Sequence, residues 1–147
     1  ASWRRAWQHF DYEMKLWPSV RDNGWLKDIL KDDFSVEFWT KIFQNSYDDK
    51  INSWAYRWKF SCWIQSYLSI LPNVNLISNI GFSNAGTNTK KYLNVYSNLP
   101  TEKLELPLKH PPFVIQDTKS DIFSQSTLYN PSIMTKLKFK FKAYLEK

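Results

Sequence analysis

The sequence predicts an α-rich α/β fold with few short strands, and three observations support this. Apolar residues recur at spacings of three and four in the first half of the chain, which is the helical period. One short apolar run, residues 74–82 (VNLISNIGF), is typical of a strand that opens into a loop. With 147 residues, 43% of them apolar and 23% charged, the chain has the composition of one globular domain.

The N-terminal segments predict short helices. Residues 2–10 form an amphipathic helix in this interpretation, because helical spacing places four apolar side chains on one face: Trp3, Ala6, Trp7 and Phe10. Pro18 is expected to close the segment that follows. The pair Asn23 and Gly24 can turn the chain before a second short helix at residues 25–30 (WLKDIL).

Two longer helices follow in the prediction. The first starts near Phe34 with Ser35 as its N-cap, carries Phe38, Trp39, Ile42 and Phe43 at helical spacing, and ends near residues 47–50 (YDDK). Ser53 can cap the second helix, which is apolar nearly all round and is therefore expected to be buried. Pro72 is expected to end this second helix.

The second half of the chain is less regular. After the predicted strand, residues 98–117 contain four prolines and are expected to be extended. The last fifteen residues, 133–147, alternate as a strand would, yet also align apolar residues on one helical face, and helix is preferred. The chain is interpreted as one partial domain, residues 1–147, in which residues 114–147 are a C-terminal extension with a basic tail.

Charge and residue counts exclude several classes of function. The net charge is +6, and five lysines lie in residues 133–147, where they form either a solvated face or an attraction to anionic lipid. Residues 1–59 carry ten basic and nine acidic groups, so nucleic-acid binding is not favoured. Only three glycines occur, which excludes a Gly-rich phosphate-binding loop.

The other counts concern metals, disulfides and membranes. A single cysteine, Cys62, and two histidines exclude an internal disulfide and a structural zinc cluster. Residues 60–89 carry no charge, but polar residues and Pro72 interrupt them, so a membrane span is not expected. These features predict a soluble cytoplasmic protein, with a peripheral contact to the membrane as the open alternative.

Aromatic residues make up 18% of the chain and point to a carbohydrate site. Rings stack on the apolar faces of sugars, while Asn, Gln and Ser side chains bind hydroxyl groups. The default interpretation is that the same rings fill a core, and the carbohydrate site is the alternative.

Three segments carry a resemblance to a known family: residues 3–18 (WRRAWQHFDYEMKLWP), residues 54–82 (WAYRWKFSCWIQSYLSILPNVNLISNIGF) and residues 106–113 (LPLKHPPF). They closely resemble the C-terminal portion of bacterial nucleotide-diphospho-sugar transferase-like proteins, some of which are labelled hemolytic-protein-like. The resemblance implies the acceptor-side half of a GT-A type glycosyltransferase fold, without the half that binds the nucleotide.

The resemblance also implies a function. The intact enzyme would move a sugar from a nucleotide-diphospho-sugar donor to a hydroxyl of a carbohydrate acceptor, with either retention or inversion, and this chain would be inactive alone. A divalent metal, Mn²⁺ or Mg²⁺, would hold the diphosphate, and a carboxylate would take the acceptor proton.

The site residues follow from this resemblance. In similar sequences the tryptophan that opens the second of these segments is followed by Asp. In this chain Trp54 is followed by Ala55, so the catalytic base would be Asp48 or Asp49. His110 is the candidate metal ligand. The candidate substrate-binding residues are Arg4, Arg5, Trp54, Arg57, Trp58 and Asn88.

Each of these residues also has a purely structural interpretation, as a helix cap, a surface charge or part of the core. Because Ala55 cannot accept a proton, the alternative function is a non-catalytic protein that binds a carbohydrate or a membrane surface, with the basic tail as the membrane contact.

Overall fold

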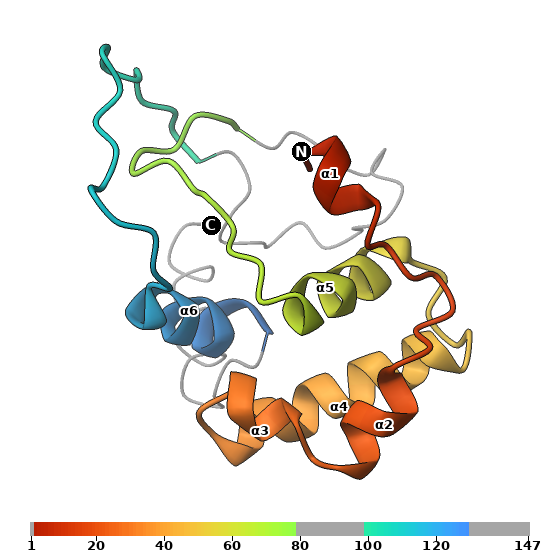
Figure 1. Ribbon diagram of the computed structural model, residues 1–147. Coiled ribbons are helices and arrows are strands. Elements are labelled where there is room, and N and C mark those ends of the chain that lie inside the picture. Colours follow the sequence, from red (N-terminus) through yellow and green to blue (C-terminus); the bar gives the residue numbers. More distant parts are fainter. Residues whose placement is uncertain (1, 79–98, 130–147) are drawn as a thin grey trace, which may run out of the picture. The chain divides into compact units, whose positions relative to one another are not determined.

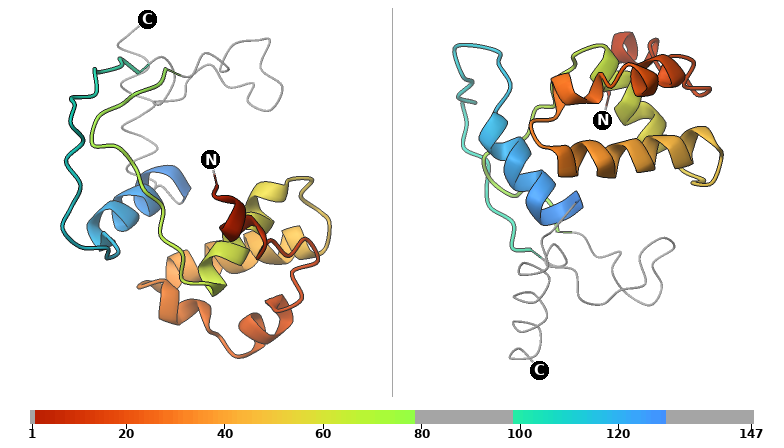
Figure 2. Two further views of the ribbon diagram at one scale, coloured as in Figure 1. Left: turned by 45° about the horizontal axis from the view of Figure 1, so that its top comes forward. Right: turned by 90° about the horizontal axis from the view of Figure 1, so that it is seen from below.

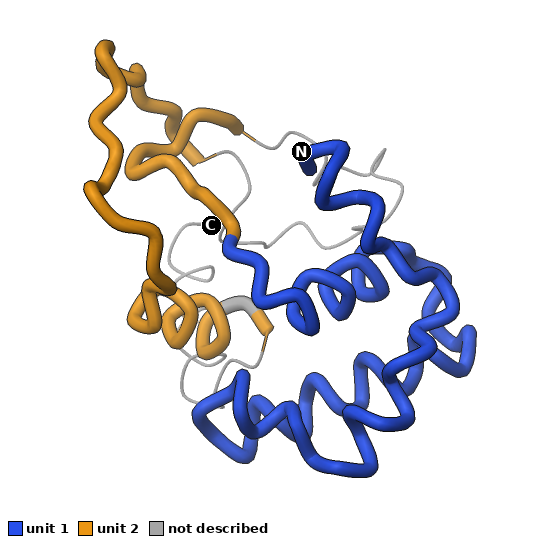
Figure 3. Tube along the Cα trace, in the orientation of Figure 1, with its two compact units in different colours: residues 1–68 blue, residues 69–147 orange. Residues whose placement is uncertain are grey.

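The computed structural model describes residues 2–78 and 99–129 (Figure 1). The chain divides into two compact units, residues 1–68 and residues 69–147 (Figure 3). The two units are described separately below.

The first unit is built around its longest helix, α4 (Asp33–Tyr47). Helices α2 (Trp17–Asp22), α3 (Leu26–Ile29) and α5 (Trp54–Ile64) all contact α4, and α1 (Arg4–Trp7) lies beside α5 (Figure 2). Large apolar side chains from these helices and from the loop before α2 form the core: Met14, Trp17, Val20, Leu26, Trp39, Phe43 and Phe60. The helical spacing of Trp39 and Phe43 in the sequence therefore marked buried positions correctly.

Helix starts in this unit are set by capping side chains. Asp32, and not Ser35, is the N-cap of α4, because its carboxylate accepts a hydrogen bond from the Ser35 backbone N–H at 2.8 Å. An acidic cap also suits the positive end of the helix dipole. Ser53 caps α5 as predicted, accepting from the Ala55 N–H at 3.3 Å. Pro18 lies at the start of α2 and does not close the segment before it, since a proline in the first helical turn loses no hydrogen bond.

Helix α5 is shorter and less buried than predicted. It ends at Ile64, well before Pro72, and Ser66 just beyond it has a positive φ of 53°. Its buried residues are Arg57, Phe60 and Ser61, whereas Trp54 is 58% exposed. The helix therefore presents an aromatic residue to solvent at its first turn.

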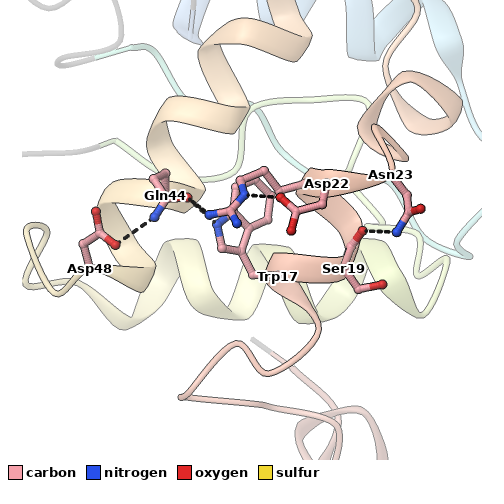
Figure 4. A network of polar contacts seen from close by, with 7 residues as sticks. Trp17, Ser19, Asp22, Asn23, Gln44 and Asp48 are labelled. Atoms are coloured by element: carbon pink, nitrogen blue, oxygen red, sulfur yellow. Dashed lines mark hydrogen bonds and ion pairs between the residues drawn. The ribbon is translucent and has the colours of Figure 1, made fainter.

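A polar network joins α2 to the C-terminal end of α4 (Figure 4). The Gln44 side-chain oxygen accepts from the Trp17 indole N–H at 3.0 Å and from Arg21 at 2.8 Å. The Gln44 amide donates to Asp48 at 2.7 Å. The network satisfies the indole of a fully buried tryptophan and ties Asp48 to the end of its own helix.

The second unit contains α6 (Thr118–Ser124), which continues into a π-helix, η1 (Gln125–Tyr129). Asp117 caps α6 by accepting from the backbone N–H groups of Lys119 and Ser120. Within residues 99–117 the described chain is irregular, as the four prolines predicted.

The predicted α/β class, and with it the GT-A type half, is wrong for the described residues, which contain helices and no strand. Residues 74–78 of the predicted strand are irregular, and residues 79–82 lie outside the described part. Among the described residues, the backbone of residues 74–78 makes one hydrogen bond to the segment that begins at residue 99. In this bond the Glu102 N–H donates to the Asn75 carbonyl at 2.8 Å. A β-ladder needs donors at alternate residues, and Pro100, two residues before Glu102, has no backbone N–H to donate.

The preferred helix at residues 133–147 also lies outside the described residues. Among the helices that are described, none combines the length and the apolar composition needed to cross a bilayer.

Candidate functional site

A pocket of about 440 Å³ lies in the first unit, where the loop after α4 leads into α5. Seven residues line it: Tyr12, Asp49, Ile51, Asn52, Ser53, Trp54 and Arg57. Three of them, Asp49, Trp54 and Arg57, are among the site residues that the sequence analysis named. The structure brings these three together around one cavity.

Arg57 is the anchor of the pocket. Its side chain is 4% exposed, and its guanidinium donates to the backbone carbonyls of Tyr12 and Ser46, each at 2.5 Å. The guanidinium also lies over the Tyr12 ring, 4.2 Å from the centroid. A buried cation with charge-assisted bonds to the loop before α2 and to the last turn of α4 holds these two segments together. Arg57 therefore fixes the floor of the pocket.

Asp49 places a carboxylate at the pocket. It accepts from the Arg57 guanidinium at 2.5 Å, yet its side chain is 77% exposed. The Asp49 backbone has a φ of 56°, in the left-handed region that few non-glycine residues adopt. The surrounding contacts thus hold the carboxylate in a fixed place while leaving it accessible to a ligand.

Asp48, the other predicted base, belongs to a different set of contacts and does not line the pocket. Its carboxylate accepts from Lys50 at 2.8 Å and from the Gln44 amide at 2.7 Å, and the bond with Gln44 is part of the network in Figure 4. The hydrogen bond from Lys50, then that from Gln44, hold the pKa of Asp48 below its ordinary value. Because Asp49 lines the pocket and Asp48 does not, Asp49 is the better candidate.

The rim of the pocket combines rings with polar groups. Trp54 and Tyr12 are each 58% exposed. Asn52 is exposed and also lines the pocket, and the hydroxyl of the next residue, Ser53, caps α5. Exposed rings beside amide, hydroxyl and carboxylate groups suit a ligand that has both apolar faces and hydroxyl groups.

The other predicted site residues lie elsewhere. Trp58 is half-buried, 4.8 Å from the Trp7 ring, and does not line the pocket. Arg4 and Arg5 are exposed on α1, and Arg5 lies over the Trp3 ring at 4.8 Å. His110 is exposed in the second unit.

Asn88 lies outside the described residues. Within residues 2–78 and 99–129, no group of three His, Cys, Asp or Glu side chains gathers in a way that could hold a metal ion. The described residues therefore form no all-protein cage for the divalent metal that the resemblance implies.

Sequence reasoning missed four lining residues: Tyr12, Ile51, Asn52 and Ser53. The last three lie between Asp49 and Trp54, so naming both ends of this loop could have led to them. Tyr12 gave no signal, because its contact with Arg57 spans 45 residues of sequence.

Comparisons of the chain with protein-family models, with curated proteins and with solved structures found no match.

Proposed function

We propose that this chain is part of a glycosyltransferase and that the pocket around Arg57 binds the carbohydrate acceptor. The proposal rests on one observation: two exposed rings, Tyr12 and Trp54, border a cavity that also holds an accessible carboxylate, Asp49, fixed by a buried arginine. The resemblance of residues 54–82 to nucleotide-diphospho-sugar transferase-like proteins supports the choice of reaction.

The pocket suits a sugar for physical reasons. The apolar face of a pyranose ring stacks on an indole, and the exposed face of Trp54 is available for this contact. Asn52 and Asp49 can bind the hydroxyl groups at the ring edge. A cavity of about 440 Å³ lies within the size range of ordinary small-ligand sites.

Asp49 has the role of general base in this proposal. The acceptor hydroxyl gives its proton to the Asp49 carboxylate, and its oxygen forms the bond to the anomeric carbon of the donor. The bond from that carbon to the diphosphate breaks, and the nucleoside diphosphate leaves. Arg57 keeps the carboxylate aimed at the pocket. If a divalent metal assists the leaving group, it would neutralise the charge that develops on the diphosphate, and no group of three ligating side chains among the described residues would hold it alone.

One observation favours a second candidate, a carbohydrate-binding protein without catalysis. The contacts of Arg57 with Ser46 and Asp49 also satisfy the end of α4, so the ion pair has a sufficient structural role. In that case the pocket binds sugar and Asp49 transfers no proton.

Calorimetric titration of the 147-residue chain tests the shared claim. The probes are the methyl glycosides of glucose, galactose, mannose and N-acetylglucosamine. Trp54→Ala is expected to weaken binding of the best probe at least tenfold, a change of about 1.4 kcal/mol. Trp25→Ala is the matched control, since Trp25 is 55% exposed but does not line the pocket. Equal affinity of the Trp54 variant and the unaltered chain contradicts the proposal.

The full-length product of the gene separates the two candidates. Incubated with nucleotide-diphospho-sugars and the bound saccharide, a transferase releases nucleoside diphosphate, and Asp49→Asn abolishes this release while saccharide affinity stays within a few fold. Saccharide binding without any release favours the non-catalytic candidate. The coding sequence upstream of Ala1 is informative here too, because the transferase requires a donor-binding segment.

A further inference from the structure

We propose that the pocket continues into a second sugar subsite formed by Trp7 and Trp54, so that the ligand is an oligosaccharide and not a single sugar. This inference rests on the proposed carbohydrate site. It adds a residue, Trp7, that does not line the pocket itself.

Trp54 belongs to both subsites. Its ring lines the pocket, and it meets the Trp7 ring with centroids 5.7 Å apart and an interplanar angle of 78°. Trp54 is 58% exposed and Trp7 is 44% exposed. Two partly exposed rings nearly at right angles make a corner, and Trp54 is the residue that this corner shares with the pocket.

Two aromatic residues, Phe10 and Trp58, hold the Trp7 ring in position. This ring stacks on Phe10 with centroids 4.6 Å apart and packs against the half-buried Trp58 at 4.8 Å. The contact with Trp58 fastens α1 to α5, which lie side by side in Figures 1 and 2. These contacts account for the covered part of Trp7. A ring held by several aromatic contacts loses little freedom when a ligand binds to its exposed part.

An oligosaccharide fits this surface better than an apolar peptide does. A peptide that covered both tryptophans would extend toward Asn52 and Asp49, and apolar groups there would leave polar atoms without partners. Successive sugar units present the same combination of apolar face and hydroxyl edge to both places. In this arrangement the first sugar of the oligosaccharide occupies the pocket beside Asp49, and the second sugar lies against Trp7.

Calorimetric titrations of the 147-residue chain with a chain-length series test the inference. The probes are the methyl glycoside that binds best and the disaccharide and trisaccharide built from the same sugar. We expect Trp7→Ala to weaken disaccharide and trisaccharide binding roughly tenfold, which corresponds to about 1.4 kcal/mol, and to leave monosaccharide affinity unchanged. Trp7→Phe, which keeps a ring, should restore most of the loss.

Two controls separate binding from folding. Trp25→Ala should alter neither affinity, and the Trp7 variants should bind the monosaccharide as well as the unaltered chain does, which reports an intact pocket. If Trp7→Ala lowers the affinity for monosaccharide and disaccharide equally, or lowers neither affinity, the second subsite is overturned and the proposed function stands. If none of the saccharides binds, both proposals fail. Self-association of the unaltered chain that Trp7→Ala abolishes, without any change in oligosaccharide affinity, overturns the second subsite in favour of a dimer contact.

Discussion

Replacement of Arg57 by methionine tests how the pocket is held together. Methionine keeps much of the apolar stem of arginine and removes the guanidinium. The variant thus loses the bonds to the carbonyls of Tyr12 and Ser46 and the ion pair with Asp49. The two carbonyls keep their places beside a side chain that can no longer donate.

The expected loss of stability comes almost entirely from those two carbonyl bonds. Hydrogen bonds that involve a charged partner contribute about 1.5–3 kcal/mol each, so the two bonds together are worth about 3 kcal/mol at the low end of that range. The ion pair adds little, because Asp49 is 77% exposed and water screens it. A unit of residues 1–68 has on the order of 3–10 kcal/mol of stability, so the Arg57→Met variant is expected to lose roughly a third or more of it.

Urea unfolding followed by tryptophan fluorescence measures this loss directly. All eight tryptophans lie in residues 1–68, so the signal reports the first unit alone. Asp49→Asn is the matched control, and its free energy of unfolding should fall by less than about 1 kcal/mol. The reasoning is refuted if Arg57→Met costs less than about 1 kcal/mol, or if Asp49→Asn costs as much as Arg57→Met.

Three further predictions concern other parts of the first unit. Asp32→Ala should lower the free energy of urea unfolding by about 1 kcal/mol through loss of the α4 cap, and an equal effect of the neighbouring Asp33→Ala would contradict this. Because the folded pKa of Asp48 lies below 3.8, its contribution to stability is complete above that pH and is lost as the pH falls through the folded value. Asp48→Asn should therefore flatten the acid limb of a stability profile below pH 3.8, and an unchanged limb would count against the Lys50 and Gln44 contacts. Burial raises the pKa of the Cys62 thiol, so at pH 8 iodoacetamide should alkylate Cys62 more slowly than it alkylates the thiol of free glutathione. Equal alkylation rates would contradict the burial of Cys62.

Local features of the fold could be predicted from the sequence. The spacing of Trp39 and Phe43 marked the buried face of α4, and Ser53 marked the start of α5, because both signals act within one or two helical turns. The Asp32 cap was missed in favour of Ser35, three residues later. Two polar residues at that spacing both look like caps, and only the geometry shows which one accepts and which one donates.

Features that depend on distant contacts could not be predicted. A strand needs a neighbouring segment that offers a ladder of backbone hydrogen bonds. The apolar run at residues 74–82 carries no information about that neighbour. In its described part, residues 74–78, the run receives one such bond, from Glu102. The candidate site was partly accessible, since Asp49, Trp54 and Arg57 were all named. The burial of Arg57 among carbonyls, and its contact with Tyr12, come from tertiary packing alone.

The central claim is that a carbohydrate binds beside Trp54, and fluorine NMR of the chain labelled with 5-fluorotryptophan tests it most directly. Each of the eight tryptophans gives one signal, which single substitutions assign. On titration with the best-binding saccharide, we expect the Trp54 signal to move and the signals of Trp25 and Trp39 to stay in place. Movement at Trp25 without movement at Trp54, or no movement of any signal, would contradict the account.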